Sequence, residues 1–252
     1  MKIFLSGVDT GDGKRGIEGL LKRDMTFKYN LMSYYYVSKG AEAHAEVIRD
    51  RSELILIDSG AHSFQFGIKV EWEEYTRQYA DFIRRFDRPN VLGYFEMDIE
   101  NIIGYDNVKE LRKILEAESD KIIPVWHPER GIQDYHDMCQ KYSGKVIAIG
   151  GFKGTDIKDN QFLMFLKTAR RYNCKVHCLG MTRTQVLDKV PFDFTDSSSW
   201  VQCAIYGRTF VGRQRYAKAK GERKQRQLML NYLQGMEMQA YYHAKWRKVC
   251  ND

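Results

Sequence analysis

Acidic side chains and one histidine stand where predicted strands end, and these residue types could do chemistry at a shared site. Asp58 follows the apolar run Leu54–Ile57, Asp98 follows Val91–Met97, His127 follows Lys121–Trp126, and Asp196 follows Phe192–Thr195. An acid at the end of a buried strand is costly unless it is paired, hydrogen-bonded or used. Carboxylates in one site can serve as nucleophile and as general acid or base at an electrophilic carbon, such as C1′ of a sugar.

Each of these acids also has another interpretation. Asp58, in the segment Asp58-Ser59-Gly60, could cap the next helix or begin a turn. Several aspartates could instead hold a divalent metal, as in a phosphoesterase. The acids are scattered, however, and the histidines form no recognised metal signature. Because the strand-end pattern recurs along the chain, we favour acid–base or nucleophilic chemistry with no metal and no cofactor.

The elements that must position these groups alternate between strand and helix. Strands are expected to begin near residues 2, 54, 91, 121, 145, 175 and 192, with a less clear eighth strand at Arg208–Val211. Helical spacing of apolar residues marks the segments Ala41–Arg49, Trp72–Phe86, Val108–Leu115, Ile132–Tyr142, Gln161–Tyr172 and Thr184–Lys189. This alternation predicts an α/β fold with a parallel sheet closed as a (β/α)8 TIM barrel, whose strand ends meet at one mouth. A doubly wound open sheet is the alternative.

Two N-terminal segments have less specific patterns. The stretch GVDTGDGKRG after the first strand lacks the P-loop spacing, so a simple strand-to-helix loop is expected. Tyr29–Val37 is dense in aromatic residues, which predicts core packing and the start of a helix. A wall for a flat ligand or for bases is the alternative interpretation of that segment.

The chain of 252 residues has no linker-like stretch, so we expect residues 1–206 to form the catalytic barrel and 207–252 a basic C-terminal helical segment packed on it. The formal net charge is +7 and the pI is about 9.0. Much of that excess lies in the tail, at Arg208, Arg213, Arg215, Lys218, Lys220, Arg223, Lys224 and Arg226. Since Glu222 is the only acid among them, phosphate contacts are favoured over a solvated helix face.

The cysteines and the hydropathy suggest a compartment. An odd count of five cysteines without a recognisable signal peptide indicates reduced thiols in a cytoplasmic compartment. Cys174 and Cys178 are expected on the face of a strand opposite His177. No CxxC pair or second ligand cluster follows, which argues against a zinc site there. No apolar run approaches the roughly 20 residues of a membrane span, so no membrane association is expected.

Three short motifs in residues 54–200 resemble those of the tRNA-guanine transglycosylase superfamily, in the same order. Asp58-Ser59-Gly60 with Phe64-Gln65 is similar to the DSGGFQ strand end, Ile147–Phe152 to the AIGG-L segment, and Phe192–Asp196 to the VDMFD segment that carries the nucleophile. The CxCxxC zinc site of the tRNA enzymes has no match, and the chain is much shorter. It is therefore most similar in type to the 7-deazaguanine DNA transglycosylases of phages and bacteria.

The resemblance implies a role for each matching position. Asp196 would attack C1′ and form a glycosyl ester, and Asp58 would be the general acid and base. The implied substrate-binding residues are Asp98, His127, Gly150, Gly151, Gln65 and Phe152, with His127 standing where the family has a glutamine. Ser63 is an alternative to Gln65, and Phe95 or Tyr34 is expected to stack on the base.

The expected function is base exchange in DNA, in which a 7-deazaguanine such as preQ0 replaces guanine without a cofactor. The expected partners are DNA, guanine and the deazaguanine base, while an accessory protein or a homodimer stays open. The residues assigned to the nucleic acid are Arg208, Arg213, Arg215, Lys218, Lys220, Arg223 and Lys224. The alternatives are the same chemistry on tRNA, a metal-dependent barrel hydrolase, and a non-catalytic nucleic-acid-binding barrel.

Overall fold

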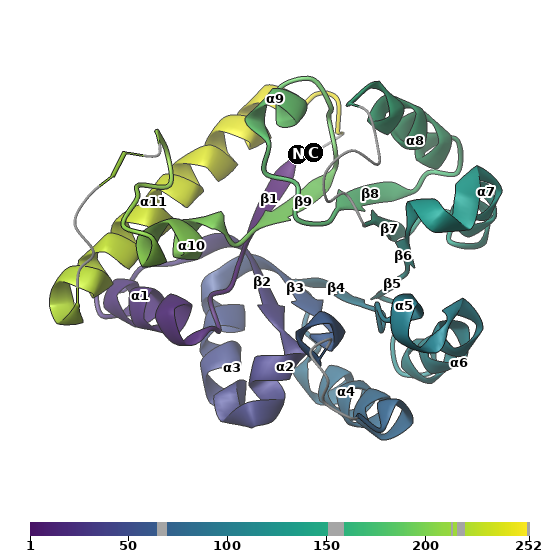
Figure 1. The fold of residues 1–252 in the computed structure, drawn as a ribbon, viewed down its shortest axis with the longest axis horizontal. Helices are drawn as coiled ribbons and strands as arrows, with labels where there is room; N and C mark the ends of the chain where they lie inside the picture. Colours follow the sequence, from purple (N-terminus) through teal and green to yellow (C-terminus); the bar gives the residue numbers. More distant parts are fainter. Residues whose placement is uncertain (65–69, 151–158, 213, 216–219, 251–252) are drawn as a thin grey trace.

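Residues 1–64, 70–150, 159–212, 214–215 and 220–250 are described by the computed structural model of this chain. They form a central parallel sheet with a ring of helices around it (Figure 1). The strands are β1 (Lys2–Ser6), β2 (Phe27–Ser33), β3 (Ser52–Asp58), β4 (Val91–Phe95), β5 (Ile122–Ile123), β6 (Val125–Trp126), β7 (Val146–Ile149), β8 (Lys175–Cys178) and β9 (Phe194–Ser197).

The sheet closes into a barrel, which confirms the predicted fold. Its strand order is β5-β4-β3-β2-β1-β9-β8-β7-β6. The first and last strands of this order, β5 and β6, are separated in the sequence by Pro124 alone. Proline has no N–H to donate to a neighbouring strand, so the ladder is interrupted there. The Pro124 carbonyl still accepts from the Ala148 N–H at 2.8 Å. Residues 122–126 therefore act as one interrupted strand, and the barrel has the eight-strand arrangement of a TIM barrel.

Helices connect successive strands and cover the outside of the barrel (Figure 1). They are α1 (Gly11–Leu21), α2 (Tyr34–Tyr36), η1 (Val37–Ala41), α3 (Glu42–Arg51), η2 (Ala61–Phe64), α4 (Trp72–Phe86), α5 (Glu100–Ile103), α6 (Tyr105–Glu116), η3 (Pro128–Arg130), α7 (Gly131–Lys141), α8 (Asp159–Arg171), α9 (Thr184–Leu187), α10 (Ser199–Ile205) and α11 (Gly221–Trp246). None of the described helices combines the length and apolar composition needed to cross a bilayer.

One strand lies elsewhere than predicted. The eighth strand is β2, Phe27–Ser33, and Arg208–Val211 is not a strand but joins a single antiparallel bridge between Arg208 and Arg215. β2 lies between β1 and β3 and is largely buried, so its sequence does not alternate between apolar and polar residues. The helix start predicted within Tyr29–Val37 is present, because α2 follows β2 directly.

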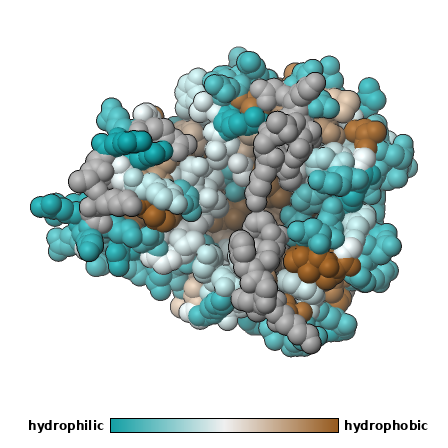
Figure 2. All heavy atoms as spheres, in the orientation of Figure 1, coloured by the Kyte–Doolittle hydropathy of each residue, from teal (hydrophilic) through white to brown (hydrophobic). Residues whose placement is uncertain are grey.

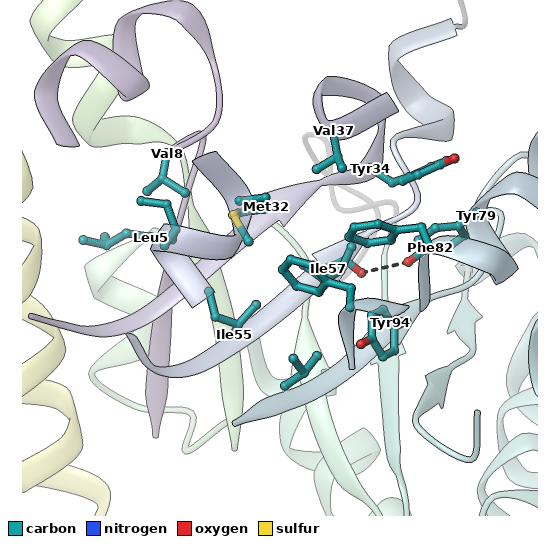
Figure 3. Packing of buried hydrophobic residues seen from close by; sticks show 14 of the residues in the cluster. Leu5, Val8, Met32, Tyr34, Val37, Ile55, Ile57, Tyr79, Phe82 and Tyr94 are labelled. Atoms are coloured by element: carbon teal, nitrogen blue, oxygen red, sulfur yellow. Dashed lines mark hydrogen bonds between the residues drawn. The ribbon is translucent and has the colours of Figure 1, made fainter. Parts of the chain in front are cut away.

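The two faces of each strand enter different parts of the core. On β3, Ile55 and Ile57 point outward and pack with Tyr79 and Phe82 of α4 (Figure 3). The inner face contributes to a separate cluster that fills the barrel, made of Phe4, Tyr29, Leu31, Leu56, Phe95, Ile123, Val125, Ala148 and Phe194. This interior cluster is the floor beneath the mouth.

The C-terminal helix α11 packs closely on the barrel. It lies against α1, α10, β1 and β2, and the Gln239 side chain donates hydrogen bonds to the carbonyls of Ile3 and Tyr29 at 2.8 and 2.7 Å. Gly235 permits a close approach to β1, since a Cβ there would lie 2.8 Å from Leu5 Cδ1. The boundary at residue 206 between the barrel and the C-terminal segment stays a prediction. The contacts of α11 show that this helix packs on the barrel.

Gly235→Ala is expected to destabilise the fold by about 1–3 kcal/mol, because a methyl group would overpack the contact with the fully buried Leu5. Urea unfolding measures the loss. The matched control is Gly11→Ala in the first turn of α1, where an added Cβ meets nothing within 4 Å. That variant should be neutral or slightly stabilised, and equal losses in both variants would contradict the close packing of α11.

Candidate functional site

A ring of small, polar or acidic residues lines the mouth of the barrel, one layer above the floor. Side chains alternate along a strand, so the residue two positions after an interior apolar residue again points inward. This two-residue step leads from Phe4 to Ser6, Leu31 to Ser33, Leu56 to Asp58, Val125 to His127, Ala148 to Gly150, and Phe194 to Asp196. The strand ends therefore converge as predicted, and Asp98 joins them three residues beyond β4.

Asp196 is held by hydrogen bonds to both carboxylate oxygens. Its Oδ1 accepts from the Gly180 N–H at 2.7 Å and lies 3.1 Å from His177 Nε2. Its Oδ2 accepts from the Ser6 hydroxyl at 3.3 Å. Gly180, with φ of +63°, makes the turn after β8 that aims its N–H at the carboxylate. Contacts from β1, from β8 and from the turn after β8 thus hold the carboxylate of β9 in one orientation, which attack by a nucleophile requires.

Asp58 sits on a segment that α4 holds in place. The Tyr75 hydroxyl donates to the Ser59 carbonyl at 2.8 Å, and the Tyr79 hydroxyl lies 3.3 Å from the carbonyl of Ile57 (Figure 3). The pKa of Asp58 is raised to about 7, chiefly by burial and also by the charge of Asp98, against the opposing effect of a hydrogen bond from the Gly60 N–H. Asp58 can therefore both hold and release a proton near neutral pH.

A second acid of this kind, Asp9, follows β1 and was not singled out in the sequence. It is 5% exposed and accepts a hydrogen bond from the Ser33 N–H. The pKa of Asp9 is raised to about 7, because the effect of burial outweighs that of the hydrogen bonds from the backbone. The charge of Asp9 in turn contributes to the raised pKa of Asp58, so the two acids belong to one electrostatic group at the mouth.

Folding stability should fall as pH rises from about 4 to about 7, because the folded state retains protons on Asp9 and Asp58 that the unfolded chain has lost. Between pH 5 and pH 8 each carboxyl should contribute about 2 kcal/mol to this loss. Urea unfolding at the two pH values measures it. Asp9→Asn and Asp58→Asn should each flatten the dependence, and an unchanged slope in both variants would show that neither carboxyl is protonated in the fold.

Asp98 and His127 form a pair on the part of the ring that follows β4 and β6. His127 Nε2 lies 2.6 Å from Asp98 Oδ1. Burial acts to lower the pKa of His127, but the hydrogen bond and charge of Asp98 outweigh it, and the net effect is a raised pKa. A Cβ at Gly150 would lie 3.0 Å from His127 Cε1, so the glycine leaves room beside the imidazole. The pair presents a carboxylate oxygen and an imidazole edge to a ligand in the mouth.

Among the described residues, one group has donor atoms close enough to hold a metal ion. One donor atom from each of Glu100, His127 and Glu129 lies within 4.8 Å of the others. However, Glu129 is exposed and the Arg130 guanidinium lies 3.3 Å from Glu100. Since the arginine already balances one carboxylate, this group fits a metal ion only in part.

The described cations of the predicted nucleic-acid interface lie along α11. Lys220 and Arg223 are at its start, while the segment of Arg208, which bridges to Arg215, is hydrogen-bonded to Asn231 in the middle of the helix. Arg215, Lys220 and Arg223 are exposed and Arg208 is half-buried, and within the described chain none of the four takes part in an ion pair. Figure 2 shows a strongly hydrophilic surface on the side where α11 begins. These four side chains are available to phosphates.

Lys224 has a different role from its predicted neighbours. Its Nζ lies 2.7 Å from Asp12 Oδ1, and this ion pair joins α11 to the first turn of α1. Tyr206 and Val211 flank Arg208 in the chain and are 63% and 53% exposed. An exposed ring and an exposed aliphatic side chain beside cations suit contact with unstacked bases.

The structure brings Asp58, Asp98, His127, Gly150 and Asp196 together, as the strand ends predicted. Five assigned residues lie outside the described chain, namely Gln65, Gly151, Phe152, Arg213 and Lys218.

The two candidates for stacking on the base do not line the mouth. Tyr34 packs in the outer layer, 4.8 Å from the Tyr79 ring. Phe95 is buried in the floor, 1% exposed.

The sequence analysis did not single out Ser6, Asp9 and Ser33 of the mouth, nor His177 of the floor beneath it. Ser6 ends its strand, and that position was the available signal. His177 was placed correctly on the face of β8 opposite Cys174 and Cys178, which lie in an outer cluster. All five cysteines lie in the described part of the chain, where they are buried and form no disulfide.

No family model and no curated protein matches the sequence. Two structures of mutant tryptophan synthase alpha-subunit from the hyperthermophile Pyrococcus furiosus are similar in fold, each with a TM-score of 0.50 and 15% identity over 91% of this chain and 96% of that chain. A protein from Aquifex aeolicus VF5 gives a TM-score of 0.43 with 12% identity over 87% of this chain and 96% of that one. The tryptophan synthase structures support the TIM-barrel fold.

Proposed function

We propose that this protein is an enzyme that exchanges guanine in DNA for a 7-deazaguanine base through a covalent Asp196 intermediate. The observation that carries the proposal is the pairing of two different acids in one barrel mouth. Asp196 is fixed by hydrogen bonds, whereas Asp58 is buried with a pKa near 7 and is influenced by the charge of Asp196. A fixed carboxylate suits a nucleophile, and an acid that titrates near neutral pH suits proton transfer.

In the first half of the reaction, Asp196 attacks C1′ of the target nucleotide. A bond forms between the carboxylate and C1′, the glycosidic C1′–N9 bond breaks, and its electron pair leaves with guanine. Asp58 in its protonated form donates a proton to the departing base. In the second half, the incoming deazaguanine loses its N9 proton to Asp58 and N9 attacks C1′, which restores the Asp196 carboxylate.

The Asp98–His127 pair is assigned to recognition of the base. Guanine and 7-deazaguanine carry adjacent N–H donors on the pyrimidine edge, and a carboxylate is the matching acceptor. His127 fixes Asp98 through the hydrogen bond of 2.6 Å, so the carboxylate keeps one orientation in the mouth. Asp98→Ala should therefore raise the KM for the free base more than it lowers the rate at saturating base.

The choice of DNA as the substrate rests on the cations beside α11 and on the resemblance to the DNA enzymes. A target in a duplex must leave the stack before C1′ can reach the mouth. Arg208, Arg215, Lys220 and Arg223 would hold the backbone on either side without reading sequence.

The test is an exchange reaction with purified protein, preQ0 and either guanine-containing DNA or tRNA, followed by digestion and mass analysis of the nucleosides. A deazaguanosine product in DNA alone is the expected result. A product in tRNA alone would keep the chemistry and reverse the choice of substrate. No product with either nucleic acid would overturn the proposal.

A metal-dependent hydrolase is the second candidate, and the Glu100–His127–Glu129 group is the observation that favours it. The two candidates differ in their response to a chelator. We expect base exchange to survive extensive dialysis against EDTA, because neither Asp196 nor Asp58 needs a metal to act. Loss of activity that added divalent cation restores would instead favour the hydrolase.

A further inference from the structure

One buried histidine has no place in the mechanism above. His177 is fully buried and belongs to β8, where it faces the barrel interior between Phe4 and Phe95. Its ring centroid lies 5.0 Å from that of Phe95 and 6.2 Å from that of Phe4. The other strands contribute apolar residues to this layer, so a histidine in the floor calls for a partner.

The ring nitrogens of His177 have different surroundings. Nε2 lies 3.1 Å from Asp196 Oδ1, whereas Nδ1 is buried and has no hydrogen-bond partner in the described chain. A buried N–H without an acceptor is costlier than an unused lone pair. The arrangement therefore favours a neutral ring with its proton on Nε2, donated to the Asp196 carboxylate. In the other tautomer, the Nε2 lone pair would face the carboxylate oxygen.

This donor makes the two oxygens of Asp196 unequal. Oδ1 receives the His177 and Gly180 donors, at 3.1 and 2.7 Å, while Oδ2 has only the longer Ser6 contact of 3.3 Å among the described residues. An oxygen with two donors has less electron density to offer and less freedom to move. Oδ2 is thus the oxygen that is better suited to attack.

We infer that His177 is a positioning residue that fixes the Asp196 carboxylate through Oδ1 and leaves Oδ2 to form the bond to C1′. The inference rests on the proposed function for the reaction, but the hydrogen bond itself does not depend on it. His177 acts through Asp196 and touches no substrate atom.

The kinetic test follows covalent protein–DNA adduct formation on denaturing gels, with end-labelled guanine-containing DNA and no added base. His177→Leu should slow adduct formation about 100-fold with DNA affinity unchanged, because the carboxylate loses its orientation. His177→Gln, whose amide can donate to Oδ1, should recover most of the rate. The matched control is Val176→Ala, which creates a cavity on the outward face of the same strand and should react like wild type.

The outcomes separate this inference from the proposed function. A wild-type protein that forms neither adduct nor exchange product would count against the function. A wild-type protein that reacts while His177→Leu keeps its rate would overturn the role of His177. A glutamine variant as slow as the leucine variant would overturn it as well, since rescue requires a donor.

A second measurement tests the hydrogen bond without activity. Heteronuclear NMR of the histidine rings in isotopically labelled protein should show His177 protonated on Nε2 only, with slow solvent exchange. Asp196→Ala should shift the Nε2–H resonance and speed its exchange. A ring protonated on Nδ1 would overturn the inference even if no substrate had been found. So would an Nε2–H resonance whose position and exchange rate are the same in Asp196→Ala as in wild type.

Discussion

Asp196→Asn is expected to abolish base exchange, with a rate at least about 10,000-fold below wild type and no covalent adduct on DNA. An amide is a poor nucleophile, yet it has the shape of the carboxylate and keeps an oxygen that can accept from the Gly180 N–H. The variant should therefore fold and bind DNA normally. Nucleoside mass analysis measures exchange, and denaturing gels measure the adduct.

The matched control for this experiment is Asp193→Asn, at the residue directly before β9. Asp193 is buried and accepts a hydrogen bond from the Val176 N–H at 2.8 Å, on the side of the barrel away from the mouth. An asparagine there can keep that bond, so exchange should continue. Activity in Asp196→Asn, or equal loss in both variants, would rule out Asp196 as the specific nucleophile.

Arg112→Met is expected to cost about 3–5 kcal/mol of folding stability, the largest stability effect that we anticipate. Arg112 and Glu96 form an ion pair through Arg112 Nε, and their side chains are 3% and 1% exposed. Glu96 also accepts from the Val125 N–H, just after Pro124 interrupts the sheet. Removing the arginine would leave a buried carboxylate without its counter-ion where the barrel closes.

The pH dependence of that loss follows from the same burial. Burial raises the pKa of Glu96, and Arg112 opposes this effect. Without the arginine the pKa of Glu96 should rise further, so the variant should lose more stability as pH increases. Urea unfolding at two pH values tests this sign. The double variant Glu96→Gln with Arg112→Met should recover part of the loss, because no buried charge remains.

An exposed ion pair provides the comparison. Arg84 lies 2.8 Å from Glu118, with its side chain 59% exposed. Because solvent screens this pair, Arg84→Met should change stability far less than Arg112→Met does. If Arg112→Met were equally mild, the Glu96–Arg112 pair would not be what secures the end of β4 against α6.

The sequence by itself determined the fold class and most of the acids at the mouth. Strand–helix alternation predicted a closed parallel barrel, and in such a barrel each strand end meets the same mouth. Asp58 and Asp196 could be located because each is the next inward position after an apolar interior residue, Leu56 or Phe194. These are local patterns of period two, which a single strand displays without its neighbours.

Only the tertiary structure decided which groups touch. β2 was missed because both of its faces are buried and its end carries the uncharged Ser33. The contact of His177 with Asp196 depends on the register that pairs His177 with Phe194, and the Glu96–Arg112 pair joins a strand end to the outer helix α6. Registers and helix packing are set by contacts between distant segments, so no local pattern in the sequence specifies them.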